Sequence, residues 1–142
     1  MAIINYSVVI GGATTQVGTQ LPAGSQGTGI RLQDYSVQAL VETWSGSVVV
    51  DVDQGNTYQA TLIGDVTDMS VTGWPPSGEE GKVTLYIKQG TGGYSVAFPV
   101  AVKWVGGVVP TLSLTNGDVD VIVLTTVDGG TTIYGFYVGR AN

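Results

Sequence analysis

Two pairs of aspartates are the residues of this chain whose type and spacing could do chemistry. Asp51 and Asp53 form one pair, and Asp118 and Asp120 form the other. Alternate residues of a strand share a face about 7 Å apart, a distance at which two carboxylates can bind calcium or act as acid and base. Neither pair lies in the aspartate-rich loop of a calcium motif, so a solvated strand face that discourages edge pairing is the favoured interpretation. We therefore expect no catalytic, cofactor-binding or metal-binding residues.

The residue types that are missing narrow the chemistry further. The 142 residues include no cysteine and no histidine, which excludes Ser-His, Cys-His and His-zinc sites within this chain. The net charge is −6 and the few basic residues are dispersed, which argues against nucleic-acid binding. No apolar segment is long enough to span a bilayer, and the start of the chain has no basic region typical of a secretion signal. We expect a soluble chain without a membrane or nucleic-acid partner.

Short alternating strands separated by glycine turns would have to position the aspartates. Together they predict an all-β fold, an antiparallel β-sandwich of jelly-roll-like type, with no helix of ordinary length. The turn Gln54-Gly55-Asn56 predicts a hairpin between the first two strands. The predicted strands cover residues 47–53, 57–63, 65–71, 82–88, 94–98, 101–104, 112–115, 119–126 and 132–138.

The composition divides the chain into residues 1–40, an extended N-terminal arm, and residues 41–142, the β-sandwich domain. Residues 4–10 can form one strand, whereas residues 11–29 consist mostly of small polar residues and glycine, typical of a flexible loop. A loop this long is uncommon in a compact monomer. We expect the arm to be cleaved by proteases in the free protein and protected once it is ordered against another chain.

Two of the predicted strands are apolar on both faces. In residues 119–126 and 132–138 the alternation predicts one face with Ile122, Leu124, Tyr134 and Phe136, and the opposite face with Val121, Val123, Ile133 and Tyr137. A strand that is apolar on both faces must be covered on both, so the second face needs a partner subunit or the folded-back arm. Charged residues are scarce as well, five basic and eleven acidic, so the surface has little to keep copies apart. These features predict self-association, with a homotrimer or assembly onto a lattice of such units as the expected form.

The aromatic residues leave two interpretations open. They could form a surface on which sugar rings stack, or they could belong to the core and close the ends of the sheets, which is the commoner role in sandwiches. Trp74 and Trp104 lie near prolines at predicted strand ends, which favours the core. The set comprises Trp44, Tyr58, Trp74, Tyr86, Tyr94, Trp104, Tyr134, Phe136 and Tyr137.

An ordered series of motifs covers about two thirds of the chain, from about residue 47 to the C-terminus. It comprises Thr72-Gly73-Trp74-Pro75, the stretch GKVTLYIKQ at 81–89, Phe98-Pro99, Val102-Lys103-Trp104, Pro110-Thr111-Leu112, Asp118-Val119-Asp120-Val121, Asp128-Gly129-Gly130 and Tyr134-Gly135-Phe136. This series resembles a domain common in bacteriophage virion proteins, especially the C-terminal parts of tail fibres and small capsid-associated proteins. The resemblance implies an all-β virion module that is homo-oligomeric, often trimeric, and without enzymatic activity.

Fibres usually carry this domain behind a long shaft, whereas here only a forty-residue arm precedes it. We therefore expect a non-enzymatic virion structural protein, a capsid decoration or cement protein or a short head or tail appendage. Its expected partners are itself and capsid or tail proteins, and its expected location is the virion, assembled in the cytoplasm of the bacterial host. A tail-fibre module that binds a receptor or a host-surface glycan is the alternative, and a hydrolase using paired carboxylates is a third hypothesis.

Overall fold

The computed structural model describes residues 6–10, 13–17 and 39–142, and it divides into two units at the boundary between residues 38 and 39. In the first unit β1 (Tyr6–Ile10) pairs antiparallel with β2 (Ala13–Val17). The sequence predicted a strand ending at residue 10 followed by a loop, and β2 shows that the loop is wrong for residues 13–17. The prediction of a flexible arm otherwise falls on residues 11–12 and 18–38, which lie outside the described residues.

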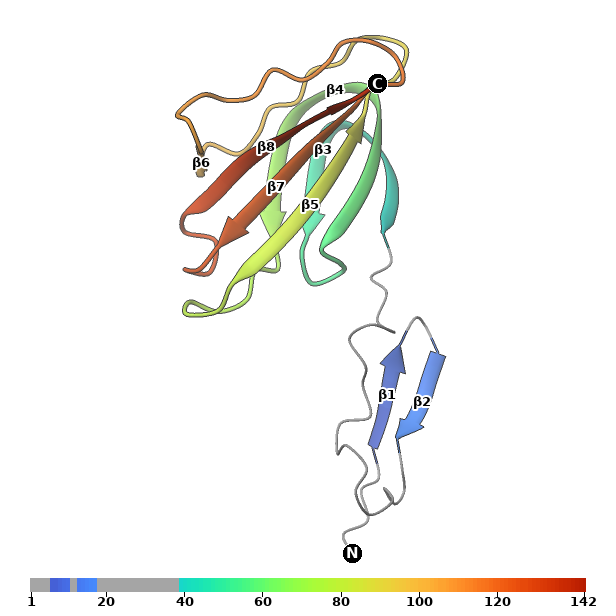
Figure 1. The fold of residues 1–142 in the computed structure, drawn as a ribbon, viewed down its shortest axis with the longest axis vertical. Helices are drawn as coiled ribbons and strands as arrows, with labels where there is room; N and C mark the ends of the chain where they lie inside the picture. Colours follow the sequence, from blue (N-terminus) through green and yellow to red (C-terminus); the bar gives the residue numbers. More distant parts are fainter. Residues whose placement is uncertain (1–5, 11–12, 18–38) are drawn as a thin grey trace, which may run out of the picture. The chain divides into compact units, whose positions relative to one another are not determined.

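The second unit is a six-stranded sheet. Its strands are β3 (Leu40–Asp51), β4 (Thr57–Thr72), β5 (Gly81–Lys88), β6 (Val102–Trp104), β7 (Val119–Thr126) and β8 (Ile133–Ala141). Their order in the sheet is β3-β4-β5-β7-β8-β6 (Figure 1). The described residues contain no helix, which confirms the all-β prediction. The antiparallel prediction is wrong, because β5 and β8 pair antiparallel with β7 while the other three pairings are parallel.

β3 and β4 form a bent parallel pair instead of the predicted hairpin. Leu40 lies beside Tyr58 and Asp51 beside Thr72, with the register shifting around Gly46. The predicted strands 57–63 and 65–71 are one strand, which curves over the end of the sheet (Figure 1). A Cβ at Gly64 would approach the Ser45 Cβ to 2.9 Å, so glycine permits close contact of the two strands at the bend. The sequence signalled the turn after β3 but not this bend.

The core lies on the concave side of the bent pair. Alternate residues of β4, β5 and β7 point inward and are almost inaccessible, as the period of two requires. The second halves of β3 and β4 add Val48, Val50, Val66 and Met69 to the same apolar cluster. Burying each large apolar side chain contributes about 1.5 to 3 kcal/mol, so this shared core holds the bent pair against the rest of the sheet.

Two predicted strands are absent from the sheet. Residues 94–98 make only an isolated bridge, between Val96 and Val66, and residues 112–115 form no strand. Backbone bonds between Val66 and the residues Ser95 and Ala97, together with side-chain hydrogen bonds, hold the first segment, and side-chain hydrogen bonds hold the second, as described below.

Candidate functional site

The outward side of the six-stranded sheet forms a regular surface. Strand register places its side chains in four rows, which we call the outer sheet face. The rows are Lys82-Thr125-Tyr134-Lys103, Thr57-Thr84-Val123-Phe136, Val41-Gln59-Tyr86-Val121-Gly139 and Thr43-Thr61-Lys88-Val119-Ala141. Strand spacing gives this surface a footprint of roughly 600 Å². It is therefore large enough to bind another macromolecule.

Exposed apolar side chains gather on the outer sheet face. Val41 is 75% exposed, and the rings of Tyr86, Tyr134 and Phe136 are 40 to 42% exposed. Val123 lies beside Phe136 in the ladder. A flat apolar surface of this kind is uncommon on a protein that stays monomeric and marks sites of association.

The two-sided pattern of β7 and β8 is confirmed, but the grouping of their residues differs from the prediction. Ile122 and Leu124 lie in the core with Ile133, whereas Val121 and Val123 share the outer face with Tyr134 and Phe136. A register shift between Val121 and Ile122 breaks the alternation in β8. The different grouping follows from the cross-strand register, which places Val123 beside Phe136 and Thr125 beside Tyr134, and the apolar pattern of each strand alone does not fix that register.

All three lysines of the chain lie on the outer sheet face, and none of its rows contains an acidic residue. Lys82 pairs with Glu80 at 3.5 Å across an exposed contact. Within residues 39–142 neither Lys88 nor Lys103 has a carboxylate within 4.0 Å. A basic apolar face therefore stands out on a chain whose net charge is −6.

A hollow of about 320 Å³ lies at one end of the outer sheet face. The residues that line it are Ala39, Thr57, Gln59, Tyr86, Lys88 and Val119. An exposed ring beside hydrogen-bonding groups can hold a small ligand with one apolar and one polar side.

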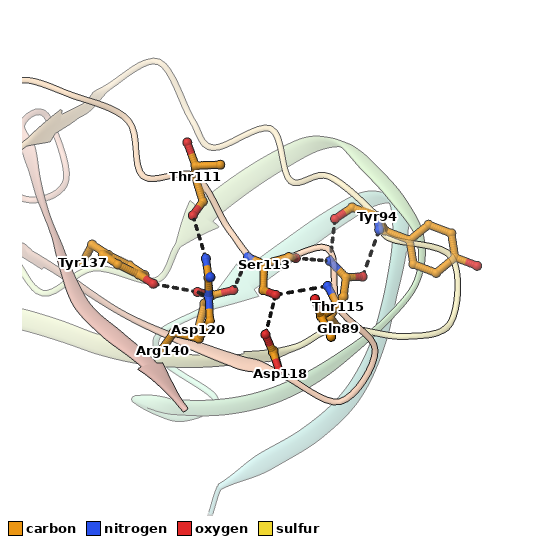
Figure 2. A network of polar contacts seen from close by, with 9 residues as sticks. All are labelled: Gln89, Tyr94, Thr111, Ser113, Thr115, Asp118, Asp120, Tyr137 and Arg140. Atoms are coloured by element: carbon orange, nitrogen blue, oxygen red, sulfur yellow. Dashed lines mark hydrogen bonds and ion pairs between the residues drawn. The ribbon is translucent and has the colours of Figure 1, made fainter. Parts of the chain in front are cut away.

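The second predicted acidic pair does not lie on a solvated face. Asp120 in β7 is 1% exposed and Asp118, the residue before β7, is 9% exposed, so both carboxylates are buried (Figure 2). Asp120 accepts hydrogen bonds from the Ser113 N–H at 2.7 Å, the Tyr137 hydroxyl at 2.8 Å and the Arg140 Nε at 3.2 Å. The prediction was wrong because strand alternation places these carboxylates on the core side, where local donors satisfy them.

The carboxylate of Asp118 completes this network from the other side of Ser113. The Ser113 hydroxyl donates to Asp118 Oδ2 at 2.6 Å and accepts from the Thr115 N–H at 3.0 Å. Burial and the nearby Asp120 charge raise the pKa of the Tyr137 hydroxyl, and the same carboxylate raises the pKa of Arg140. The network fixes the long connection between β6 and β7 against the sheet.

Gln89 anchors two connections at the end of β5. Its Nε2 donates to the carbonyls of Tyr94 at 2.8 Å and Ser113 at 2.6 Å, and its Oε1 accepts the Tyr94 N–H at 2.9 Å (Figure 2). This buried amide ties Tyr94 and Ser113 to the end of β5, where strands over residues 94–98 and 112–115 were expected. A glutamine directly after a strand gave no signal of this role in the sequence.

The first predicted acidic pair lies at the surface. Asp53 is exposed, Asp51 is partly buried, and Asp51 Oδ1 accepts the Asp53 N–H at 3.1 Å. Among the residues that the structure describes, no three acidic side chains gather as a metal site would require.

The aromatic residues divide between the two predicted roles. Trp44 and Tyr58 are core residues, and Trp74, Tyr94 and Trp104 are partly buried against the core, with Phe98 meeting Trp104 edge to face. The exposed rings are Tyr86, Tyr134, Phe136 and Tyr137. A core role is thus confirmed for the tryptophans, whereas an aromatic surface is left to the tyrosines and one phenylalanine.

Comparison of the chain with protein-family models, with curated proteins and with solved structures found no match. No helix in the described ranges is long and apolar enough to cross a membrane. Function therefore has to be argued from the outer sheet face and the residues around it.

Proposed function

We propose that this protein is a non-enzymatic structural protein of a bacteriophage virion, a capsid decoration or cement protein or a short head or tail appendage. It acts through homo-oligomerisation, as a trimer, and through docking on capsid or tail proteins. It is assembled into the virion in the cytoplasm of the bacterial host. The proposal joins the motif series of the C-terminal two thirds to one structural observation, the outer sheet face.

That observation supports self-association for a physical reason. The rings of Tyr86, Tyr134 and Phe136 protrude from a sheet whose other side already fills the core. Leaving them in water forgoes about 25 cal/mol for each Å² of apolar surface that a neighbouring chain could cover. We also propose that the sheet and the second halves of β3 and β4 act as the two layers of a sandwich-like module, which would present this face as a rigid platform.

Replacing Phe136 with serine tests the proposal. The wild-type protein is expected to sediment as a trimer at micromolar concentration, and Phe136→Ser is expected to dissociate it while its circular dichroism stays that of the folded protein. Val127→Ser removes a similarly exposed side chain from the connection between β7 and β8, and as the control it should leave the trimer intact. A wild-type protein that is monomeric throughout this range would contradict the proposal.

The virion role needs a separate experiment. Particles assembled without this protein should bind it, so it should co-sediment with them and appear as added density in electron micrographs. Absence of binding to both heads and tails would contradict a structural role while leaving self-association intact.

The hollow beside Tyr86 favours one second candidate, a module that binds a receptor or a carbohydrate. A sugar could stack on the Tyr86 ring and bond to Gln59 or Lys88, which line the same hollow. A glycan array separates this candidate from the first. Binding to a defined glycan that Tyr86→Ala abolishes would support it, and a blank array would remove it.

A further inference from the structure

A second surface of residues 39–142 carries the charge opposite to that of the outer sheet face. It consists of the exposed side chains of the second halves of β3 and β4 and their flanking residues, and we call it the return face. Register places Ser47 beside Asp68, Val49 beside Ser70 and Asp51 beside Thr72, and Asp53 and Asp65 flank these pairs. Residues 47–53 and 65–72 contain no lysine or arginine.

The carboxylates of the return face have local polar partners but no basic one. Asp68 accepts a bond from the Ser47 hydroxyl at 3.4 Å, and Asp65 accepts two from Ser95 at 2.8 and 2.9 Å. Neither ion pair of the described residues involves them. Their negative charge is therefore available to a basic partner.

We propose that the outer sheet face of one copy docks on the return face of the next copy, an inference that rests on the self-association proposed above. Lys88 and Lys103 would meet the carboxylates of Asp53 and Asp68, and the exposed rings would cover Val49, which is 57% exposed. Charge complementarity of this kind steers copies into one orientation.

The alternative contact, outer face against outer face, lacks this complementarity. Because that face contains lysines and no acidic residue, two copies would bring lysines against lysines or neutral groups. A contact between two different surfaces is heterologous, and it closes into a ring when successive rotations complete a turn. It is therefore compatible with a trimer.

The return face is narrower than the outer sheet face, since only β3, β4 and the Val66–Val96 bridge contribute to it. Attraction between charges must then supply much of the specificity. Salt screens exposed charges over about 10 Å at 0.1 M, so assembly should weaken as salt rises.

Charge reversal on each face tests the contact. Lys88→Glu/Lys103→Glu alters the outer sheet face, and Asp53→Lys/Asp68→Lys alters the return face. Each variant alone is expected to sediment as a monomer, and the chain that carries all four changes is expected to regain the wild-type assembly, because the charges are exchanged. Glu79→Lys makes the same change of sign on an exposed turn outside both faces and should have no effect.

The inference fails if Asp53→Lys/Asp68→Lys assembles like the wild type, or if the four-substitution chain stays monomeric. If the wild type is an oligomer and either variant gives such a result, the proposed self-association still stands and only the proposed contact fails. A monomeric wild type would contradict both the self-association and the contact. If Asp53→Lys/Asp68→Lys does not fold, the milder variant Asp53→Asn/Asp68→Asn tests the same contact. It should raise the dissociation constant roughly fivefold or more at low salt, and an unchanged constant would overturn the inference.

Discussion

The hydroxyl of Tyr58 forms two hydrogen bonds with the backbone of Asp51, accepting from its N–H at 3.0 Å and donating to its carbonyl at 2.8 Å. Tyr58 pairs with Leu40 at the start of β3, and Asp51 ends the same strand. In a straight strand these two positions would lie roughly 36 Å apart. One side chain spans them because β3 and β4 bend back together.

This bond pair predicts a large loss of stability in Tyr58→Phe. The change keeps the buried ring, which is 2% exposed, and leaves two backbone groups without their partner. We expect a loss of about 1 to 3 kcal/mol, or a melting temperature lower by roughly 4 to 8 °C for each kcal/mol. Urea unfolding measures it.

Tyr86→Phe is the matched control, because Tyr86 lies on the outer sheet face with an exposed ring. Measured on a dissociated background such as Phe136→Ser, its loss should stay within about 0.5 kcal/mol. Equal losses in the two variants would show that the Tyr58–Asp51 contact does not hold the bend.

The sequence located several of the strands but not how they pair. Alternation located both ends of β7 and placed the ends of β5 and β8 within three residues, because each strand has inward-facing positions that are buried. The bend of β3 and β4 was missed because short turns normally join antiparallel strands, and nothing local to Gly46 or Gly64 signals a parallel return.

The surfaces were predicted unevenly for similar reasons. Apolar residues on both faces of β7 correctly predicted a second apolar face, but the register that places Val123 beside Phe136 and Ile122 beside Tyr137 determines which side chains share it. Asp118 and Asp120 were misplaced because a charged residue on a strand is usually outside, and their donors come from Ser113 and from residues about 20 positions away. Such non-local hydrogen bonds leave no periodic pattern in a sequence.

The buried carboxylate of Asp120 predicts a second stability effect. Asp120→Ala removes the acceptor of three donors and leaves the Ser113 N–H buried without a partner, so we expect a loss of about 2 to 3 kcal/mol in urea unfolding. Arg140→Gln should cost less than Asp120→Ala, because the arginine side chain is 39% exposed and water can replace part of its contact with Asp120. A larger effect for Arg140 than for Asp120 would contradict this order.

Acid should destabilise the fold through Asp65 and Asp128. The backbone N–H and then the hydroxyl of Ser95 lower the pKa of Asp65, and the Thr132 N–H and then the Thr126 hydroxyl lower that of Asp128. A carboxyl with a lowered folded pKa adds stability above its unfolded pKa of about 3.9, and this stability is lost as the pH falls through the folded pKa.

Melting temperatures between pH 6 and pH 2 check this prediction. The wild type should lose stability below about pH 4, and Asp65→Asn/Asp128→Asn should show a flatter acid limb because the two linked groups no longer titrate. Glu79→Gln provides the carboxylate-to-amide control in an exposed turn. An acid limb of the double variant as steep as that of the wild type would show that other groups govern acid unfolding.

The last prediction concerns Asp51 and Asp53, which are interpreted as surface charges and not as a calcium site. Asp51→Asn/Asp53→Asn should leave assembly nearly unchanged at high salt, because an asparagine at position 51 still offers an oxygen to the backbone N–H of residue 53. At low salt the loss of the Asp53 charge should weaken the contact between copies.

Calcium provides the decisive measurement. A ligand that binds only the folded state adds about 2.7 kcal/mol at a concentration one hundred times its dissociation constant, which would raise the melting temperature by more than about 10 °C. We expect the wild-type melting temperature to be equal in millimolar calcium and in chelator. A reproducible rise of several degrees that the asparagine variant lacks would instead identify a metal site at the end of β3.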